Sequence, residues 1–141
     1  EGSYDGSYDR NNIVAGVDVP GSKVNQGLTI FAYTTATTGA AALWNGTPRM
    51  KNMIWVGRYL TNEWNNNPFL SPEDTWNIDT KMDDGRPAFG NFTGTAGYDG
   101  GNYMAGCVTG AYPATLAYDL AASTITCKIM YSLDQGFGPT M

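Results

Sequence analysis

The sequence contains no histidine, and charged residues are scarce. The missing histidine excludes Ser-His-Asp and Cys-His catalysis and removes the commonest zinc ligand. Charged residues make up 15% of the chain, where about a quarter is usual. Lys and Arg total eight, do not cluster, and leave a net charge of −5. This balance argues against binding to nucleic acid or to an anionic membrane surface.

Long hydrophobic runs are also missing. No apolar stretch approaches the roughly 20 residues that a membrane-spanning helix needs, and no signal peptide or initiator Met is present. The length of 141 residues suits a single globular domain, residues 1–141. Residues 1–12, which carry a tandem Gly-Ser-Tyr-Asp, are expected to form a flexible tail.

One segment has strong helix signals, and it predicts a helix over residues 72–84. Ser71 can cap the first turn, and Pro72 suits the first helical position because its missing N–H would go unused there. Gly85 offers a left-handed exit, and Pro87 prevents continuation. Thr75, Ile78 and Met82 fall at i, i+3 and i+7, so this side is expected to pack on a core.

Four other segments have the composition of strands, so we expect an α+β fold with an antiparallel sheet of about four strands and long loops. These segments are 28–35, 53–60, 89–95 and 124–133. In the last one, apolar residues alternate with more polar ones and predict the core face of the strand. They are Ile125, Cys127, Ile129, Tyr131 and Leu133. Residues 94–110 are rich in glycine and are expected to form a loop.

Residues 53–60 are apolar on both faces, which is typical of a central strand. Alternation places Ile54, Val56 and Leu60 on one side and Met53, Trp55 and Tyr59 on the other. An uncovered apolar face usually marks an interaction surface. We therefore expect one of these two sets to meet another chain or a second copy.

Cys107 and Cys127 are an even pair in a chain that otherwise looks secreted. A bridge between them would close a loop of about 20 residues and stabilise the fold by roughly 3 kcal/mol. The alternative is a pair of buried free thiols. The glycine-rich loop between them favours the disulfide.

A central motif carries a family resemblance. The run Ile78-Asp79-x-Lys81-Met82-Asp83-Asp84-Gly85-x-Pro87-x-x-Gly90 resembles a segment of bacterial type IV pilins and type II secretion pseudopilins that precedes the last strands of their globular heads. Two further matches lie at the expected distances, one upstream from Pro20 to Gly27 and one downstream. The downstream match comprises Cys107, Tyr118-Asp119-Leu120 and Thr126-Cys127-x-Ile129-x-Tyr131.

The resemblance implies a pilin-like head with a C-terminal disulfide region, acting as a structural subunit of a surface or periplasmic filament and not as an enzyme. Such proteins begin with an N-methylated spine helix of membrane-spanning hydrophobicity, which this sequence lacks. The expected partners are therefore other pilin or pseudopilin subunits, or a spine helix supplied separately. Contact with a membrane is expected only through that missing helix.

Two features leave alternatives open. Asp83 and Asp84 follow the predicted helix, where the helix dipole disfavours negative charge. They are expected to form salt bridges or turn hydrogen bonds, with Ca²⁺ binding as a less favoured alternative and no other cofactor. Aromatic residues in the loops allow a second function, a secreted carbohydrate-binding or adhesin module. These are Trp44, Trp64, Tyr98, Tyr103 and Tyr112.

Overall fold

The computed structural model describes residues 14, 16–18, 20–21, 28–33, 53–58, 67–87, 89–96, 98–99, 102–103, 105–111 and 114–133. For 28–33, 53, 98–99 and 102–103 it describes the backbone alone. The tail at 1–12, Tyr59, Leu60 and three of the loop aromatics, Trp44, Trp64 and Tyr112, lie outside these ranges. No helix in the described ranges is long and apolar enough to cross a membrane.

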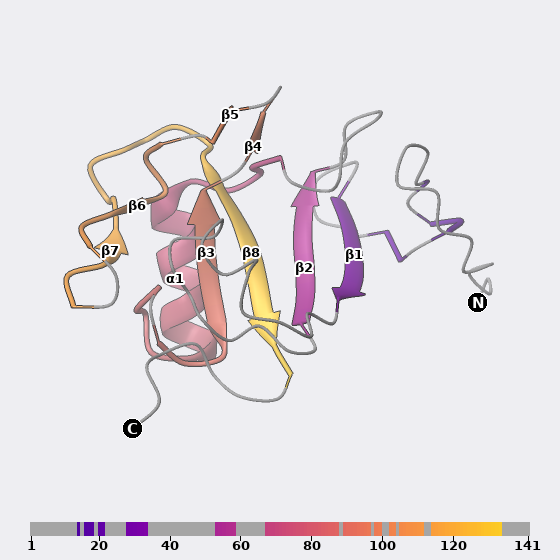
Figure 1. Ribbon diagram of the computed structural model, residues 1–141, viewed down its shortest axis with the longest axis horizontal. Helices are drawn as coiled ribbons and strands as arrows, with labels where there is room; N and C mark the ends of the chain where they lie inside the picture. The colour runs from indigo at the N-terminus through magenta and orange to yellow at the C-terminus, as the bar shows by residue number, and fades with distance from the viewer. Residues whose placement is uncertain are drawn as a thin grey trace.

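The fold is α+β, as predicted, with one antiparallel sheet and a helix beside it (Figure 1). The four-stranded sheet has the order β1-β2-β8-β3. Its strands are β1 (Leu28–Tyr33), β2 (Met53–Arg58), β8 (Cys127–Ser132) and β3 (Phe92–Ala96). The helix α1 (Pro72–Met82) packs against β3 and β8, at the end of the sheet away from β1.

Two short hairpin-like pairs occupy the segment that was predicted to be a loop. β4 (Tyr98–Asp99) pairs with β5 (Asn102–Tyr103), and β6 (Val108–Thr109) pairs with β7 (Ala117–Tyr118). Both pairs are antiparallel. The glycine content of residues 94–110 therefore does not prevent local pairing, and the loop prediction was wrong for β4, β5 and β6; β7 lies beyond that range.

The helix begins where the sequence predicts and ends two residues earlier. The Ser71 hydroxyl accepts a hydrogen bond from the Asp74 N–H at 3.1 Å, and it donates to the Asp74 carboxylate at 2.7 Å. This pair satisfies a backbone N–H that the first turn leaves unpaired. Asp83 already has non-helical backbone angles (φ −148°, ψ −123°). Its side chain binds the start of β3, which ends the helix before residue 84.

The predicted buried side of the helix was partly wrong. Pro72, Thr75 and Asp79 are buried, whereas Ile78 is half-buried and the Met82 side chain is 59% exposed. The buried residues do follow the predicted spacing i, i+3, i+7. However, the series starts at Pro72 and ends at the acidic residue Asp79. Burial of Asp79 is possible because two donors serve its carboxylate, as described below.

The predicted core face of the last strand was also wrong. Ile125 and Leu133 lie outside β8 and are each 54% exposed, while Ile129 and Tyr131 are half-buried. Cys127 is buried as expected, but so are the residues of the opposite face. These are Thr126, Lys128, Met130 and Ser132. α1 packs on the Ile129 side of β8, and the opposite side is buried as well, so alternation does not identify the core side.

Lys128 is the least expected member of that buried face, because its side chain is 0% exposed. Its side-chain nitrogen lies 4.4 Å from the ring centroid of Trp55 on the neighbouring strand. Burial lowers the pKa of Lys128 to about 6. The interior on this side of the sheet therefore favours the neutral amine.

The predicted disulfide is confirmed. Cys107 and Cys127 are bridged, with their Cα atoms 5.0 Å apart, and both side chains are fully buried. The bridge fastens the segment before β6 to the first residue of β8. Backbone hydrogen bonds of Cys127 to Leu70 and Phe69 bring the chain before the helix to the same place.

Reduction of this bridge is expected to lower the free energy of unfolding by about 3 kcal/mol, because it frees a loop of about 20 residues in the unfolded chain. Chemical denaturation with and without reductant measures the difference. Thiol titration of the denatured, unreduced protein is expected to find no reactive thiol. Two reactive thiols would contradict the bridge.

Lys128→Met is expected to become more stable relative to the unchanged protein as the pH falls from about 10 to 6. Between the folded pKa of about 6 and the ordinary value of 10.5, the unfolded chain binds one more proton than the folded chain. The unchanged protein therefore loses stability as the pH falls through this window, and the methionine variant lacks this dependence. Urea denaturation across the window tests this.

The matched control for that experiment is Lys81→Met, because Lys81 is an exposed lysine on α1. Its stability difference from the unchanged protein should stay constant over the same pH range. A constant difference for Lys128→Met as well would contradict a neutral buried lysine.

Candidate functional site

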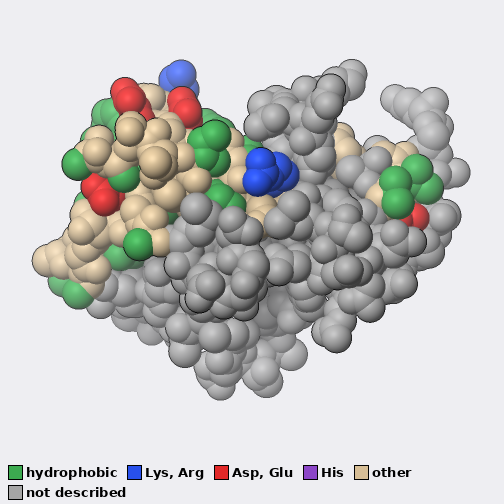
Figure 2. Space-filling model, turned by 90° about the horizontal axis from the view of Figure 1, so that it is seen from above, with side chains coloured by type: hydrophobic (Ala, Val, Ile, Leu, Met, Phe, Trp, Pro, Cys, Tyr) green, Lys and Arg blue, Asp and Glu red, His purple; other side chains and the backbone are tan. Residues whose placement is uncertain are grey.

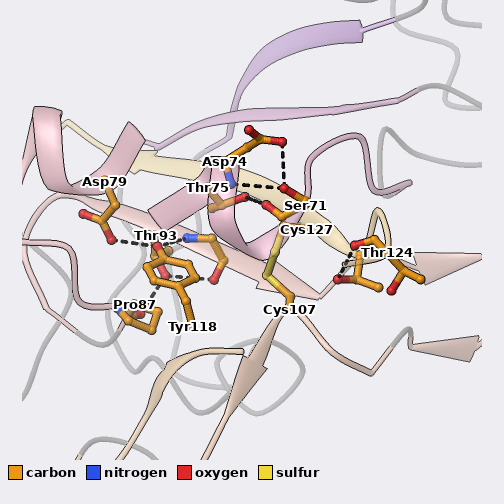
Figure 3. Close-up of a disulfide and its surroundings, with 12 residues drawn as sticks. Ser71, Asp74, Thr75, Asp79, Pro87, Thr93, Cys107, Tyr118, Thr124 and Cys127 are labelled. Atoms are coloured by element: carbon orange, nitrogen blue, oxygen red, sulfur yellow. Dashed lines mark hydrogen bonds between the residues drawn. A yellow bond between two sulfur atoms is a disulfide. The ribbon is translucent and has the colours of Figure 1, made fainter. Parts of the chain in front are cut away.

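The candidate site is a polar junction between the helix, the edge of the sheet and the β6–β7 pair (Figure 3). At its centre the Tyr118 hydroxyl donates a hydrogen bond to Asp79 Oδ2 at 2.7 Å. The same hydroxyl accepts a hydrogen bond from the Gly94 N–H at 2.9 Å. One side chain of β7 thus joins α1 to β3. We call Asp79, Tyr118 and Gly94 the junction.

Burial dominates the electrostatics of the junction. Asp79 is 0% exposed, and burial raises the pKa of its carboxyl to about 6, with smaller contributions in the same direction from Asp84 and Asp83. Hydrogen bonds from Tyr118 and from the Gly85 N–H (3.2 Å to Oδ1) oppose this increase. Burial and the nearby Asp79 also raise the pKa of Tyr118, so its hydroxyl stays protonated and remains a donor.

Gly94 is required in the junction because nothing larger fits. A Cβ atom added there would lie 2.2 Å from Thr75 Cγ2 and 2.7 Å from Tyr118 Cε1. Both distances are far below van der Waals contact. The helix can therefore approach the strand closely only where the strand carries no side chain.

Asp83 caps the same strand next to the junction. Its Oδ2 accepts hydrogen bonds from the Asn91 N–H and from the Phe92 N–H, the latter at 2.9 Å. Gly90 lies against this carboxylate with a φ of +73°, and a Cβ there would clash with all three atoms of the carboxyl group. A glycine is therefore needed at position 90 for both backbone conformation and space.

The other motif residues shape the turn between helix and strand. Asp84 accepts a hydrogen bond from the Arg86 N–H at 2.8 Å, and Gly85 has a φ of +71°. Pro87 is buried, and its carbonyl accepts a hydrogen bond from the Thr93 hydroxyl at 2.6 Å. Of the remaining motif residues on α1, Ile78 is half-buried and Lys81 is exposed.

Asp83 and Asp84 therefore make hydrogen bonds to backbone N–H groups of the turn and of β3, which is one of the arrangements expected from the sequence. In the described part of the chain, no three His, Cys, Asp or Glu side chains come together in a way that could hold a metal ion. The Asp83 oxygen that caps β3 is already directed at backbone N–H groups. This geometry gives no support to the Ca²⁺ alternative.

The residues of the expected interaction surface divide by strand face. Trp55 is 3% exposed, so it is not available as an open surface, whereas Ile54 and Val56 are half-buried. The register pairs Ile54 with Tyr131 and Val56 with Ile129. Ile129 in turn pairs with Gly94, so this is the side of the sheet that α1 approaches.

Sequence reasoning did not find the role of Tyr118 or the burial of Asp79. In the sequence, Tyr118 stood out only as part of the downstream match to the family. Asp79 stood out only as one position of the central motif. No local pattern links two residues 39 positions apart. One signal could have indicated this contact. Asp79 and Tyr118 both belong to the segments that resemble the same family, so they could have been expected to lie close together.

Comparison with protein-family models, with curated proteins and with solved structures gives no match.

Tyr118→Phe is expected to destabilise the fold by about 1–3 kcal/mol, because it leaves a buried carboxyl oxygen and a buried N–H without a partner. Combined with Asp79→Ala, which removes the acceptor, in a double-mutant cycle, the pair should show a coupling energy of about 0.5–3 kcal/mol. Denaturant unfolding of the four proteins measures both quantities.

Tyr131→Phe is the matched control, because Tyr131 is a half-buried tyrosine of β8 outside the junction. It should change the stability by no more than about 0.5 kcal/mol. Equal losses for the two tyrosine variants, or additive losses in the cycle, would contradict a direct link between Tyr118 and Asp79.

Proposed function

We propose that this chain is the globular head of a pilin- or pseudopilin-like subunit, a structural protein that assembles into a surface or periplasmic filament. In this role the chain has no enzymatic activity and acts outside the reducing environment of the cytoplasm. Its partners are further subunits of the filament, or a spine helix from another polypeptide. Nucleic acid is not among them, and the membrane is reached only through a spine helix.

The observation that supports this proposal is that two separate parts of the resemblance meet in space. Asp79 belongs to the central motif and Tyr118 to the downstream match, yet their side chains are hydrogen-bonded at 2.7 Å. Cys107 and Cys127, also in the downstream match, are bridged beside them. Two segments that are far apart in the sequence and resemble the same family are expected to contact each other if they form the same part of that family's fold.

The chemistry of the junction also fits a structural role. The Asp79 carboxyl is fully buried, and its hydrogen-bond donors are Tyr118 and a backbone N–H. Asp83 and Asp84 likewise bind backbone groups. A general acid or nucleophile must reach a substrate, whereas these acids are occupied in holding the turn and the strand.

The surface charge supports a protein partner rather than a nucleic acid. On the face shown in Figure 2, the coloured Lys and Arg side chains lie apart and form no basic patch among the described residues. The net charge of −5 acts in the same direction.

The half-buried side of β2 is the place we propose for the filament contact. Trp55 on the other side is already covered, whereas Ile54 and Val56 keep part of their apolar surface accessible. α1 covers the β3–β8 end of the same side, so a further helix beside it would continue one layer across the sheet.

Antibodies against this chain, applied to cells that produce it, are expected to label filaments in electron micrographs and to detect the chain in the sheared surface fraction. Replacing Ile54 and Val56 by Ser should reduce filament labelling while the isolated head stays folded, with a loss of about 1 kcal/mol for each half-buried side chain. Trp55→Ala should instead unfold the head, because truncating a buried aromatic costs about 3–5 kcal/mol.

Labelling of the cell surface without filaments would contradict the proposal. Binding to a glycan array that is lost in Trp64→Ala, with unchanged stability, would favour the adhesin function instead. Filaments that form normally with both serines would leave the subunit function in place but refute the contact on β2.

A further inference from the structure

The described residues of the β6–β7 segment (105–111 and 114–126) are joined to the rest of the fold by a disulfide, by hydrogen bonds and by packing on α1 and β3. The disulfide holds Cys107 to β8, and the Asp119 N–H donates to the Cys107 carbonyl within the segment at 3.0 Å. The Tyr118 hydroxyl then joins the segment to α1 and β3. Next to the disulfide, the Thr126 N–H donates to the Leu70 carbonyl at 3.1 Å. The covalent bond makes the attachment at that end permanent, whereas the Tyr118 contact is noncovalent and can open and close.

Asp79, which accepts the hydrogen bond from the Tyr118 hydroxyl, has mainly acidic charged neighbours. Within the described residues, the charged groups that act on Asp79 are two further acids, Asp83 and Asp84. From β3, Phe92 and Gly94 bring no charge, and β6 supplies Val108 and Thr109. β7 supplies Tyr118 and is followed by the half-buried Asp119.

The basic residues of the same region are exposed or lie against aromatic rings. Lys81 is an exposed residue of α1, and the Arg86 guanidinium lies over the Phe89 ring at 4.1 Å. Lys128 stands next to Trp55 on the opposite side of the sheet. An ionised Asp79 is thus stabilised by hydrogen bonds but sits in a buried site with acidic neighbours.

We propose that Asp79 and Tyr118 form a proton-controlled latch, in which protonation of Asp79 holds the β6–β7 segment against α1 and β3, and loss of that proton loosens the segment. The change is a simple proton exchange with water at the Asp79 carboxyl. The disulfide acts as the fixed attachment, so the opened segment stays on the molecule.

The physical reason is the cost of keeping a charge away from water. In the closed state burial raises the pKa of Asp79 to about 6, whereas an exposed aspartate has the ordinary value of 3.8. Between these two values the closed state binds a proton that the open state has lost. Opening therefore becomes more favourable as the pH rises from about 4 to 6, and levels off above.

Opening has a consequence for the sheet. β3 is an edge strand of the four-stranded sheet, and the Gly94 N–H points to Tyr118 instead of to β8. When Tyr118 leaves, this N–H loses its acceptor. The exchange of the Gly94 amide hydrogen with solvent therefore reports directly on the latch.

The test is amide hydrogen exchange of the full chain followed by NMR from pH 4.5 to 8, with each rate corrected for the intrinsic pH dependence of exchange. The protection of Gly94 is expected to fall by about tenfold between pH 5 and pH 7.5, from the two pKa values of Asp79. Met130, whose backbone lies in the centre of the sheet, should keep its protection over this range.

Two variants separate the latch from general loosening. Asp79→Asn removes the titrating group, so the protection of Gly94 should no longer depend on pH. Glu73→Gln removes an exposed acid from the same helix and should leave the pH dependence unchanged. In the unchanged protein, the carbon resonance of the Asp79 carboxyl should titrate near pH 6, a measurement that needs no variant.

Three results would overturn the latch. The first is a midpoint for Asp79 near 4. The second is protection of Gly94 that stays constant with pH in the unchanged protein. The third is a parallel loss of protection at Gly94 and Met130, which would show that the whole sheet opens.

Discussion

The close packing of α1, β3 and β7 depends on one buried hydroxyl, that of Tyr118, because all three elements meet at it. The helix approaches β3 so closely that Gly94 has no room for a Cβ atom. Such an approach buries a strand N–H and a helix carboxyl that would otherwise be hydrated, and an unpaired buried polar group costs about 1–3 kcal/mol. Tyr118 accepts from the first and donates to the second. The close packing and the hydrogen bonds therefore have to form together, and the disulfide keeps the segment that carries Tyr118 nearby.

The spacing of the acids in the motif follows from the geometry of a helix lying along an antiparallel strand. Asp79 and Asp83 are four residues apart, which is about 6 Å along a helix axis. Phe92 and Gly94 are two residues apart, which is about 6.6 Å along a strand. One acid therefore reaches the Phe92 N–H directly, and the other reaches the Gly94 N–H through Tyr118. Both N–H groups belong to an edge strand, and occupying them removes donors with which another strand could pair.

The sequence alone predicted the α+β class, the start of the helix, the position of the four main strands within a few residues, and the disulfide. These depend on local signals: Ser71-Pro72, β-branched runs and an even pair of cysteines. Which side of each element is buried was not predictable in the same way. Met82 is exposed and Asp79 buried because a tyrosine 39 residues away from Asp79 supplies its donor. Lys128 is buried because β8 became a central strand with Trp55 beside it, which depends on the order of the strands and not on alternation within one strand.

The same long-range dependence explains why the interior is so polar. Among the described residues, eight buried side chains are polar or charged, against seven hydrophobic ones and three prolines. Burial of polar groups adds little to stability even when every hydrogen bond is made, so a core of this kind is weaker than an apolar core of the same size. It is also more selective, since Asp79, Thr93 and Tyr118 can be satisfied only in one arrangement of helix, strand and β7. The disulfide complements this core because it lowers the entropy of the unfolded chain without needing more apolar surface. A fold built in this way gains its specificity from polar contacts and part of its stability from a covalent bond.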